Sequence, residues 1–307
     1  MIAVTLRTED AGMFDGFTKT RIETSSIAIN LVKGGEGPPL LLLHGYPQTH
    51  AMWHKVAPLL ALHYTVVAPD LRGYGDSGKP ASDDLEDHCK RASARDQVEV
   101  MAALGFDRFH VVGHDRGARV GHRMALDHPA RVRTFTSLDV VASQAAFENM
   151  DRDLAFSWFH WHLMRQPAPF PETLIGNSAK LFLDFLLEQW TAVDGAVAPE
   201  AYAEYLRCFS DPETLHCMCM DYRAIALDLV HDEADRGRKI ACPMLVLWAG
   251  TMPKRPGWQT GKGLSMLESW RERAEDVRGR ALDCGHFLPE EAPEETAREI
   301  LAFLAER

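Results

Sequence analysis

The chain has 307 residues, of which 46% are hydrophobic and 25% are charged, a composition that excludes disordered, collagen-like and coiled-coil proteins. Its 33 basic and 44 acidic side chains give a net charge of −11, which argues against nucleic acid or an anionic membrane as the main partner. There is no signal-peptide pattern, and no run approaches the ~20 apolar residues of a membrane span. Six cysteines without a C-x-x-C pair predict a reducing, cytoplasmic location rather than a disulfide framework.

Short apolar runs bounded by Gly and Pro predict the strands of one sheet. In chain order they are Ser26–Val32, Leu40–Leu43, Thr65–Ala68, Phe109–Val112, Thr134–Leu138, Met244–Trp248 and a weaker Arg280–Asp283. Helix-length stretches separate them, and Glu86–Leu104 is the clearest of these because Gly105 follows it. This alternation is typical of an α/β protein with a mostly parallel sheet and helices on both faces.

The pattern changes between Ala142 and about Arg236. Strand-like runs disappear, aromatic and aliphatic residues recur at helical spacing, and strand signals resume after Cys242-Pro243. We therefore predict a core in two pieces, residues 1–142 and 237–307, with an all-helical cap inserted at residues 143–236.

A glycine-flanked acid stands between the predicted strand at Phe109–Val112 and the helix that follows. The segment Gly113-His-Asp-Arg-Gly117 matches the nucleophile elbow G-x-Nu-x-G, in which the glycines permit a very tight strand-to-helix turn. Asp115 occupies the position of the nucleophile. The alternative interpretation is a helix N-cap, for which Asp is also favoured.

Three further segments complete the pattern of a covalent hydrolase. The loop at His44-Gly-Tyr46 is expected to supply one N–H of an oxyanion hole, and the residue after the nucleophile, Arg116, the other. His286 follows the last predicted strand, as the order nucleophile, acid, His requires. The loop from 250 to 267 contains no Asp or Glu, so Asp139, after the strand Thr134–Leu138, is the candidate acid.

These motifs resemble those of the α/β-hydrolase superfamily and, within it, the fluoroacetate (haloacetate) dehalogenases. The resemblance covers nearly the whole chain and rests on six blocks: HGYPQTH from His44, PDLRGYGDS from Pro69, GHDRGAR from Gly113, His160-Trp161 before QPAP, DYRA from Asp221, and CGHFLPEE from Cys284. The most specific of these are Asp-Arg-x-x-Arg at the elbow and His160-Trp161. Tyr46 departs from the pattern, since Phe is expected there.

A carboxylate nucleophile suits displacement at saturated carbon because it leaves an ester that water can cleave, whereas Ser would leave a stable ether. His286, steadied by Asp139, would activate that water. The resemblance implies Trp after the nucleophile in enzymes for neutral haloalkanes and epoxides, but this chain has Arg116 there. Arg119 lies on the same helix face, so the two guanidinium groups predict a carboxylate site for a small anionic halo acid.

The resemblance also implies halide-binding donors in the cap, His160, Trp161 and Tyr222, and a homodimer. A set of hydrogen-bond donors favours fluoride, which demands hydrogen bonds more than the larger halides do. Aromatic packing within the cap is the competing explanation for these side chains. We expect neither a metal nor an organic cofactor.

Three other functions remain open at this point. An epoxide hydrolase would need cap tyrosines, for which Tyr202, Tyr205 and Tyr222 are candidates, although Arg116 argues against it. A haloacid dehalogenase that prefers chloroacetate or bromoacetate has the same motifs. A non-catalytic receptor for small acids would not need His286.

Two motifs are set aside. Gly73–Gly78 matches G-x-G-x-x-G, but Pro80 and two acids follow where a phosphate-binding helix would begin. His50 and His54 have the spacing of a zinc helix without its Glu. The segment 251–265, rich in Gly, Pro and basic residues, predicts a surface loop.

Overall fold

The computed structural model describes residues 4–10, 13–251 and 265–307 of the chain. Within them, nine strands form one sheet in the order β1-β2-β3-β5-β4-β6-β7-β8-β9. The strands are β1 (Val4–Asp10), β2 (Thr18–Glu23), β3 (Ala28–Gly34), β4 (Pro39–Leu43), β5 (Thr65–Pro69), β6 (Phe109–His114), β7 (Val132–Leu138), β8 (Met244–Ala249) and β9 (Val277–Leu282). Neighbours from β5 through β9 pair in parallel, whereas β1, β2 and β3 add an antiparallel edge. The predicted α/β sheet is confirmed.

The centre of the sheet is apolar on both faces. All of Leu40–Leu43 and every residue of β5 and β6 are buried. Strands that are buried on both faces consist of consecutive apolar residues, so the sequence predicted the bounds of these strands to within one or two residues.

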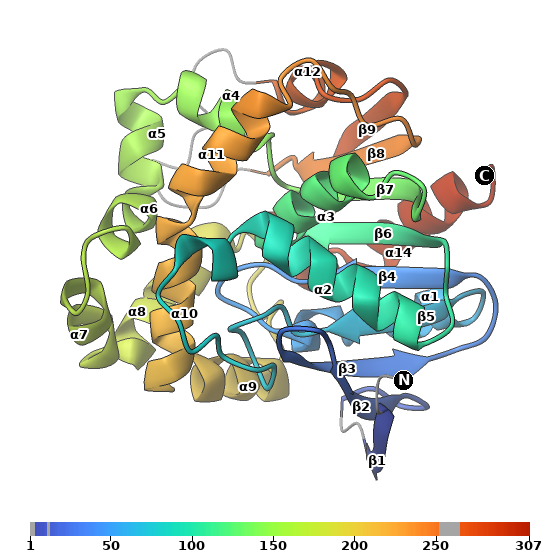
Figure 1. Ribbon diagram of the computed structural model, residues 1–307, viewed down its shortest axis with the longest axis horizontal. Helices are drawn as coiled ribbons and strands as arrows, with labels where there is room; N and C mark the ends of the chain where they lie inside the picture. The colour runs from blue at the N-terminus through green and yellow to red at the C-terminus, as the bar shows by residue number, and fades with distance from the viewer. Residues whose placement is uncertain (1–3, 11–12, 252–264) are drawn as a thin grey trace.

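The helices of the described residues pack on both faces of the sheet and in a separate layer beyond its carboxyl ends. They are α1 (Ala57–Ala61), α2 (Lys90–Ala103), α3 (Arg116–Asp127), α4 (Ser143–Glu148), α5 (Arg152–Ser157), α6 (Phe159–Met164), α7 (Phe170–Gly176), α8 (Ala179–Trp190), α9 (Pro199–Phe209), α10 (Pro212–Arg223), α11 (Ile225–Ala234), α12 (Met266–Arg271), α13 (Leu288–Glu291) and α14 (Pro293–Leu304). Helices α2 and α3 lie on one face, and α1 and α14 lie on the other (Figure 1). Every helix in the described ranges is too short or too polar to cross a membrane.

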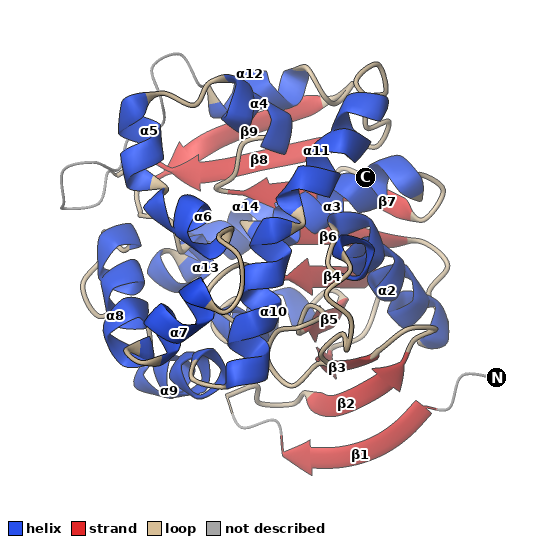
Figure 2. Ribbon diagram, turned by 60° about the vertical axis from the view of Figure 1, so that its left-hand side comes forward, coloured by secondary structure: helices blue, strands red, loops and turns tan. Residues whose placement is uncertain are grey.

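The chain between β7 and β8 is helical and comprises α4 to α11, which we call the cap helices. In Figure 2 the arrows of β4, β6 and β8 point toward this layer, so the carboxyl ends of the parallel strands face the cap helices. Ligand sites in such sheets form at this edge. The division into core pieces 1–142 and 237–307 and a cap domain 143–236 remains our interpretation of this arrangement.

Several boundaries differ from the sequence prediction. Strands β1 and β2 were not predicted, because their sequences are largely polar. Helix α2 begins at Lys90 rather than Glu86, since a short 3₁₀ helix at Leu85–Asp87, capped by Asp84, precedes it. Strand β9 spans Val277–Leu282 rather than 280–283, because its extent follows from pairing with β8 and not from apolar residues. Within the predicted loop 251–265, residues 252–264 lie outside the described residues.

Candidate active site

Asp115 lies in the sharp turn between β6 and α3. Its φ of 46° and ψ of −112° are rare for a residue with a side chain. The flanking glycines permit this turn: a Cβ on Gly113 would lie 2.5 Å from the Gly117 carbonyl oxygen, and one on Gly117 would lie 2.4 Å from the Leu43 carbonyl oxygen. The strand, tight turn and helix expected of a nucleophile elbow are therefore present.

Asp115 stands at the N-cap position of α3, but its side chain makes no capping hydrogen bond, which contradicts the alternative interpretation that it serves as a cap. Its Oδ1 instead accepts a hydrogen bond from the Tyr46 backbone N–H at 3.0 Å. The loop approaches so closely that a Cβ on Gly45 would lie 2.6 Å from the Asp115 Cβ. This backbone N–H is the one that the sequence assigned to an oxyanion hole.

His286 and Asp139 form a hydrogen-bonded pair beside this turn. His286 Nδ1 lies 2.7 Å from Asp139 Oδ2, and Asp139 Oδ1 accepts a hydrogen bond from the Ala249 N–H at 2.9 Å. Asp139 directly follows β7 and has a φ of 49°. Among the described non-glycine residues only Asp115 and Asp139 have a positive φ, and such strain concentrates at functional sites.

The charges of the site favour an ionised nucleophile and a basic histidine. Burial alone would raise the pKa of Asp115, but electrostatic interactions with His286, His114 and the nearby arginines hold that pKa below its ordinary value. Burial would lower the pKa of His286, but the hydrogen bond and charge of Asp139 raise it. Hence Asp115 is a carboxylate near neutral pH, and His286 has increased proton affinity.

A cavity of about 320 Å³ adjoins these groups. It is lined by both core and cap residues: Asp115, Arg119, Asp139, Val140, Val141, Leu154, Trp158, His160, Trp161, Trp190, Tyr222, Trp248, Ala249, Ser265, Met266 and His286. The predicted nucleophile, base and acid thus share one largely aromatic pocket.

The two predicted arginines differ in their surroundings. Arg119 lines the cavity, its Nη1 donates to Ser143 Oγ at 2.7 Å, and burial together with Arg116 lowers its pKa to about 10. Arg116 is fully buried, and its Nε and Nη2 bind the side chain and the carbonyl oxygen of Asp221. Its Nη1 has no hydrogen-bond partner among the described residues. Arg119 thus places a cation at the cavity wall, whereas Arg116 is not a lining residue and lies behind the ring of Tyr222, 4.5 Å from its centre.

The predicted halide donors gather on one side of the cavity. The Tyr46 ring stacks on His160 with the planes 2° apart and meets Tyr222 edge-on. Burial lowers the pKa of His160 to about 3, so its ring is neutral, and burial raises the pKa of Tyr222 well above its ordinary value. Trp161 packs beneath the Arg119 guanidinium at 4.9 Å. Tyr46 itself is behind this layer and does not line the cavity.

Some residues of the site were not identified from the sequence. Trp158, Trp190 and Leu154 line the cavity, and Asp221 holds Arg116. Asp221 belongs to a block on which the family resemblance rests, and an acid within a mostly apolar helical segment was the signal that could have identified it. The proximity of these four residues to Asp115 depends on how the cap helices pack, which the local sequence does not specify.

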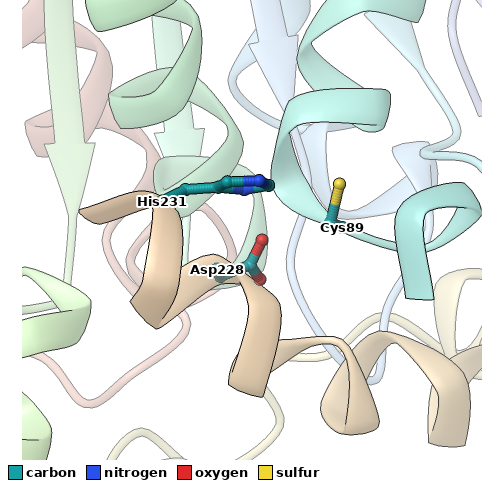
Figure 3. Close-up of side chains that lie close together, drawn as sticks. All are labelled: Cys89, Asp228 and His231. Atoms are coloured by element: carbon teal, nitrogen blue, oxygen red, sulfur yellow. The ribbon is translucent and has the colours of Figure 1, made fainter. Parts of the chain in front are cut away.

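One group of potential metal ligands occurs among the described residues, away from the cavity. Ligand atoms of Cys89, Asp228 and His231 lie within 4.8 Å of one another at the start of α2 and on α11 (Figure 3). Asp228 Oδ1 already accepts the Lys90 N–H at 2.7 Å, and Oδ2 lies 3.9 Å from the Lys90 ammonium. We therefore assign these residues to the packing of α11 against α2. The His50 side chain pairs with Asp70 at 2.7 Å, in a short 3₁₀ helix.

Comparison with known proteins agrees with this geometry. Residues 38–293 match the alpha/beta hydrolase fold family. A fluoroacetate dehalogenase from Burkholderia sp is 44% identical over 300 residues, which are 96% of each chain. A soluble epoxide hydrolase from Corynebacterium sp. (strain C12) is 32% identical and matches 90% of this chain and 93% of its own.

A solved structure shows the same arrangement over nearly the whole chain. A putative alpha/beta hydrolase from Nostoc sp PCC 7120 superposes with a TM-score of 0.89 at 52% identity, covering 94% of this chain and 98% of its own. Fold, elbow and sequence identity lead to one conclusion: the chain belongs to the alpha/beta hydrolase fold family.

Proposed function

We propose that the protein is a haloacetate dehalogenase that converts fluoroacetate and water to glycolate, fluoride and a proton. The observation that carries this proposal is a cavity lined by both an ionised carboxylate at a nucleophile elbow, Asp115, and a buried guanidinium, Arg119. The 44% identity to a fluoroacetate dehalogenase over nearly the whole chain supports it.

In the first step, Asp115 displaces the halide. The Tyr46 N–H binds Oδ1, so Oδ2 is the attacking atom on the CH₂ carbon of the substrate. A C–O bond forms as the C–F bond breaks, and the bonding pair leaves with fluoride. Arg116 and Arg119 neutralise the substrate carboxylate, and the donors His160, Trp161 and Tyr222 solvate the departing fluoride.

In the second step, water cleaves the ester on Asp115. His286 takes a proton from the water as its oxygen attacks the Asp115 carbonyl carbon, and Asp139 stabilises the imidazolium that forms. The oxyanion develops on Oδ1, which already lies 3.0 Å from the Tyr46 nitrogen. The tetrahedral intermediate then collapses by breaking the bond between the Asp115 Cγ and Oδ2. Oδ2 leaves with the CH₂ group as glycolate and takes the proton from His286, while the water oxygen stays on Asp115, which loses a proton to restore the carboxylate.

Halide release tests this proposal directly. Fluoroacetate and chloroacetate are supplied separately, and fluoride and chloride are followed with ion-selective electrodes. Fluoride release that is absent in Asp115→Asn is expected. Release of chloride from chloroacetate without release of fluoride from fluoroacetate would support the same mechanism but show that the substrates are chloro or bromo acids. Release of neither ion by folded protein would overturn the proposal.

Epoxide hydrolysis is the second candidate, because an epoxide hydrolase is 32% identical over most of the chain. Of the three cap tyrosines considered for opening an epoxide ring, Tyr222 lines the cavity. The hydroxyl of Tyr205 is bound to Glu290, and that of Tyr202 to Asp184. A single lining tyrosine beside two buried arginines favours an anionic substrate.

We also propose that the protein is a cytoplasmic homodimer. Four exposed apolar side chains on neighbouring helices α7 and α8, which we call the α7–α8 patch, support a self-association surface: Phe170, Leu174, Leu181 and Phe185. The cysteine spacing supports the reducing compartment.

A further inference from the structure

The Arg116 guanidinium belongs to a buried charge network that extends beyond the cavity. Asp221 on α10 accepts the Arg116 Nε–H at 2.7 Å through Oδ2 and the Nη2–H at 2.9 Å through its main-chain oxygen. Two edges of the guanidinium are thereby occupied, and Nη1 is left as a buried donor without a described partner. Such a donor is costly unless a ligand satisfies it.

Asp221 is itself held from two sides. Its Oδ2 also accepts the Tyr74 hydroxyl at 3.0 Å, and its Oδ1 pairs with the Lys90 ammonium. Lys90 begins α2 and is 4% exposed. Its backbone N–H and ammonium face Asp228 on α11, whose side chain lies beside Cys89 in Figure 3. The four charges of Arg116, Lys90, Asp221 and Asp228 sum to zero when all are ionised.

This network also reaches the proposed halide site. Tyr222 follows Asp221 directly in α10 and lines the cavity, and the Arg116 guanidinium lies 4.5 Å from the centre of its ring. A shift of Asp221 would therefore displace a carboxylate-binding cation and a halide donor together. Asp221, Lys90 and Arg116 are not among the lining residues of the cavity, and Arg116 lies directly behind Tyr222, which does line it.

We propose that Asp221, fixed by Lys90 and Tyr74, is a positioning residue that holds Arg116 with Nη1 free for the carboxylate of the substrate. This inference rests on the proposed function, since it assigns Arg116 to substrate binding. It accounts for the burial of Lys90 away from the cavity: without Lys90, the Asp221 carboxylate would keep only Tyr74 and Arg116 as side-chain partners.

The test compares Asp221→Asn, Lys90→Met and Tyr74→Phe with Asp127→Asn. The control removes a carboxylate that pairs with Arg123 on the same helix α3, far from the elbow. The measurements are kcat and KM for fluoroacetate and the Kd of glycolate by calorimetry. Asp221→Asn should raise KM and the glycolate Kd by about 10- to 100-fold, as expected for a disturbed charge-assisted hydrogen bond. Its kcat should fall by a smaller factor than KM rises, because Arg116 loses its partner while Tyr222 remains in the cavity wall.

Lys90→Met should raise both constants by about 3- to 10-fold and Tyr74→Phe by about threefold, because each removes a support of Asp221 and leaves its bond to Arg116. If Asp221→Asn does not fold, the KM and glycolate Kd of these two variants decide whether Asp221 positions Arg116. A fall in kcat with an unchanged glycolate Kd would show a purely structural role and overturn the inference, as would equal effects in Asp127→Asn.

The proposed function and this inference can fail separately. Wild-type protein that binds glycolate without releasing halide would overturn the dehalogenase and leave the positioning role to be judged by the Kd values. Halide release by wild type, with glycolate bound equally by all variants, would overturn only the positioning role. Wild type with neither property would overturn both.

Discussion

At the scale of single residues, the side chains of Asp115, His286 and Asp139 divide the proposed reaction between them. The Asp115 carboxylate is ionised because surrounding cations outweigh its burial. The Nδ1 of His286 is engaged by Asp139, so in the proposed reaction the other ring nitrogen accepts the proton from water. Displacement therefore depends on Asp115, and ester hydrolysis depends on the His–Asp pair.

Replacing the base should trap the intermediate. In His286→Ala, Asp115 can still displace fluoride, but ester hydrolysis should slow by roughly 100- to 10,000-fold. After incubation with fluoroacetate, intact-protein mass spectrometry should show one added carboxymethyl group, located on the peptide that contains Asp115. Asp115→Asn is the control and should stay unmodified. A folded His286→Ala protein of unchanged mass would contradict the covalent route.

The pH dependence of kcat should show that Asp139 controls the pKa of His286. Only neutral His286 acts as a base, and its folded pKa is raised above its ordinary value, so activity should fall as the pH drops through that raised pKa. In Asp139→Asn the charge that raises the pKa is lost, and the acid limb of the kcat profile should move to lower pH. The maximum kcat should also fall, by roughly 100-fold or more. An acid limb at the wild-type position would show that Asp139 does not control His286.

At the scale of elements, the parallel sheet brings the site together. Strands β6, β7 and β8 are adjacent, and Asp115 N donates to the Leu138 carbonyl, while Asp139 N donates to the Leu247 carbonyl. The ends of consecutive parallel strands therefore place the nucleophile and the acid side by side, although 24 positions separate them in sequence. Helix α3 starts directly after Asp115, so its positive end also favours the ionised carboxylate.

A single carboxylate joins the loop that carries His286 to the end of cap helix α8. Glu291 Oε2 accepts the N–H groups of Gly285, Ala192 and Val193 at 2.8 to 3.0 Å, and Oε1 accepts that of Phe287 at 2.9 Å. Four backbone donors thus depend on one side chain. The sequence placed Glu291 in a family block without giving it a role.

Glu291→Gln should loosen this junction. The amide of Gln has only one acceptor oxygen, so some of the four backbone N–H groups lose their acceptor. Each lost hydrogen bond should lower the free energy of unfolding by about 1–3 kcal/mol. Thermal unfolding should show a lower Tm, and kcat should fall because His286 is held less firmly. Glu294→Gln, at an exposed position at the start of α14, is the matched control and should change stability by less than about 0.5 kcal/mol. Equal melting curves for the two variants would contradict this role.

At the scale of the whole molecule, the core supplies the reacting groups, and the cap helices supply most of the aromatic wall. This division brings Trp158, His160 and Trp190 over a nucleophile that lies more than 40 positions earlier in the chain. The cap helices also present the α7–α8 patch on their outer side. We therefore expect the proposed homodimer to form through the cap helices.

Self-association should depend on that patch. Leu181 is 70% exposed on α8, and Leu181→Glu would place a charge within the proposed interface. Light scattering after size-exclusion chromatography should give a dimer for wild type and a monomer for Leu181→Glu. Leu62→Glu, at a residue 75% exposed after α1, should remain dimeric. A monomeric wild type would overturn the homodimer.

The sequence by itself predicted the central strands and the elbow, together with Asp115 and His286 as site residues, because each has a local signature. It reached Asp139 by elimination, because the loop from 250 to 267 contains no acid. Leu40–Leu43 is an uninterrupted apolar run, and glycines two residues before and two after Asp115 mark the turn. The tertiary structure alone decided the edge strands β1 and β2, the ligands of Arg116 and the junction at Glu291. These features depend on contacts between residues that are far apart in the sequence, by as much as 131 positions for Lys90 and Asp221. Hydrogen-bond and ion-pair partners at such separations leave no periodic pattern in the sequence. The position of the proposed nucleophile is therefore encoded locally, whereas the orientation of the cation beside it is set by the packing of the cap helices.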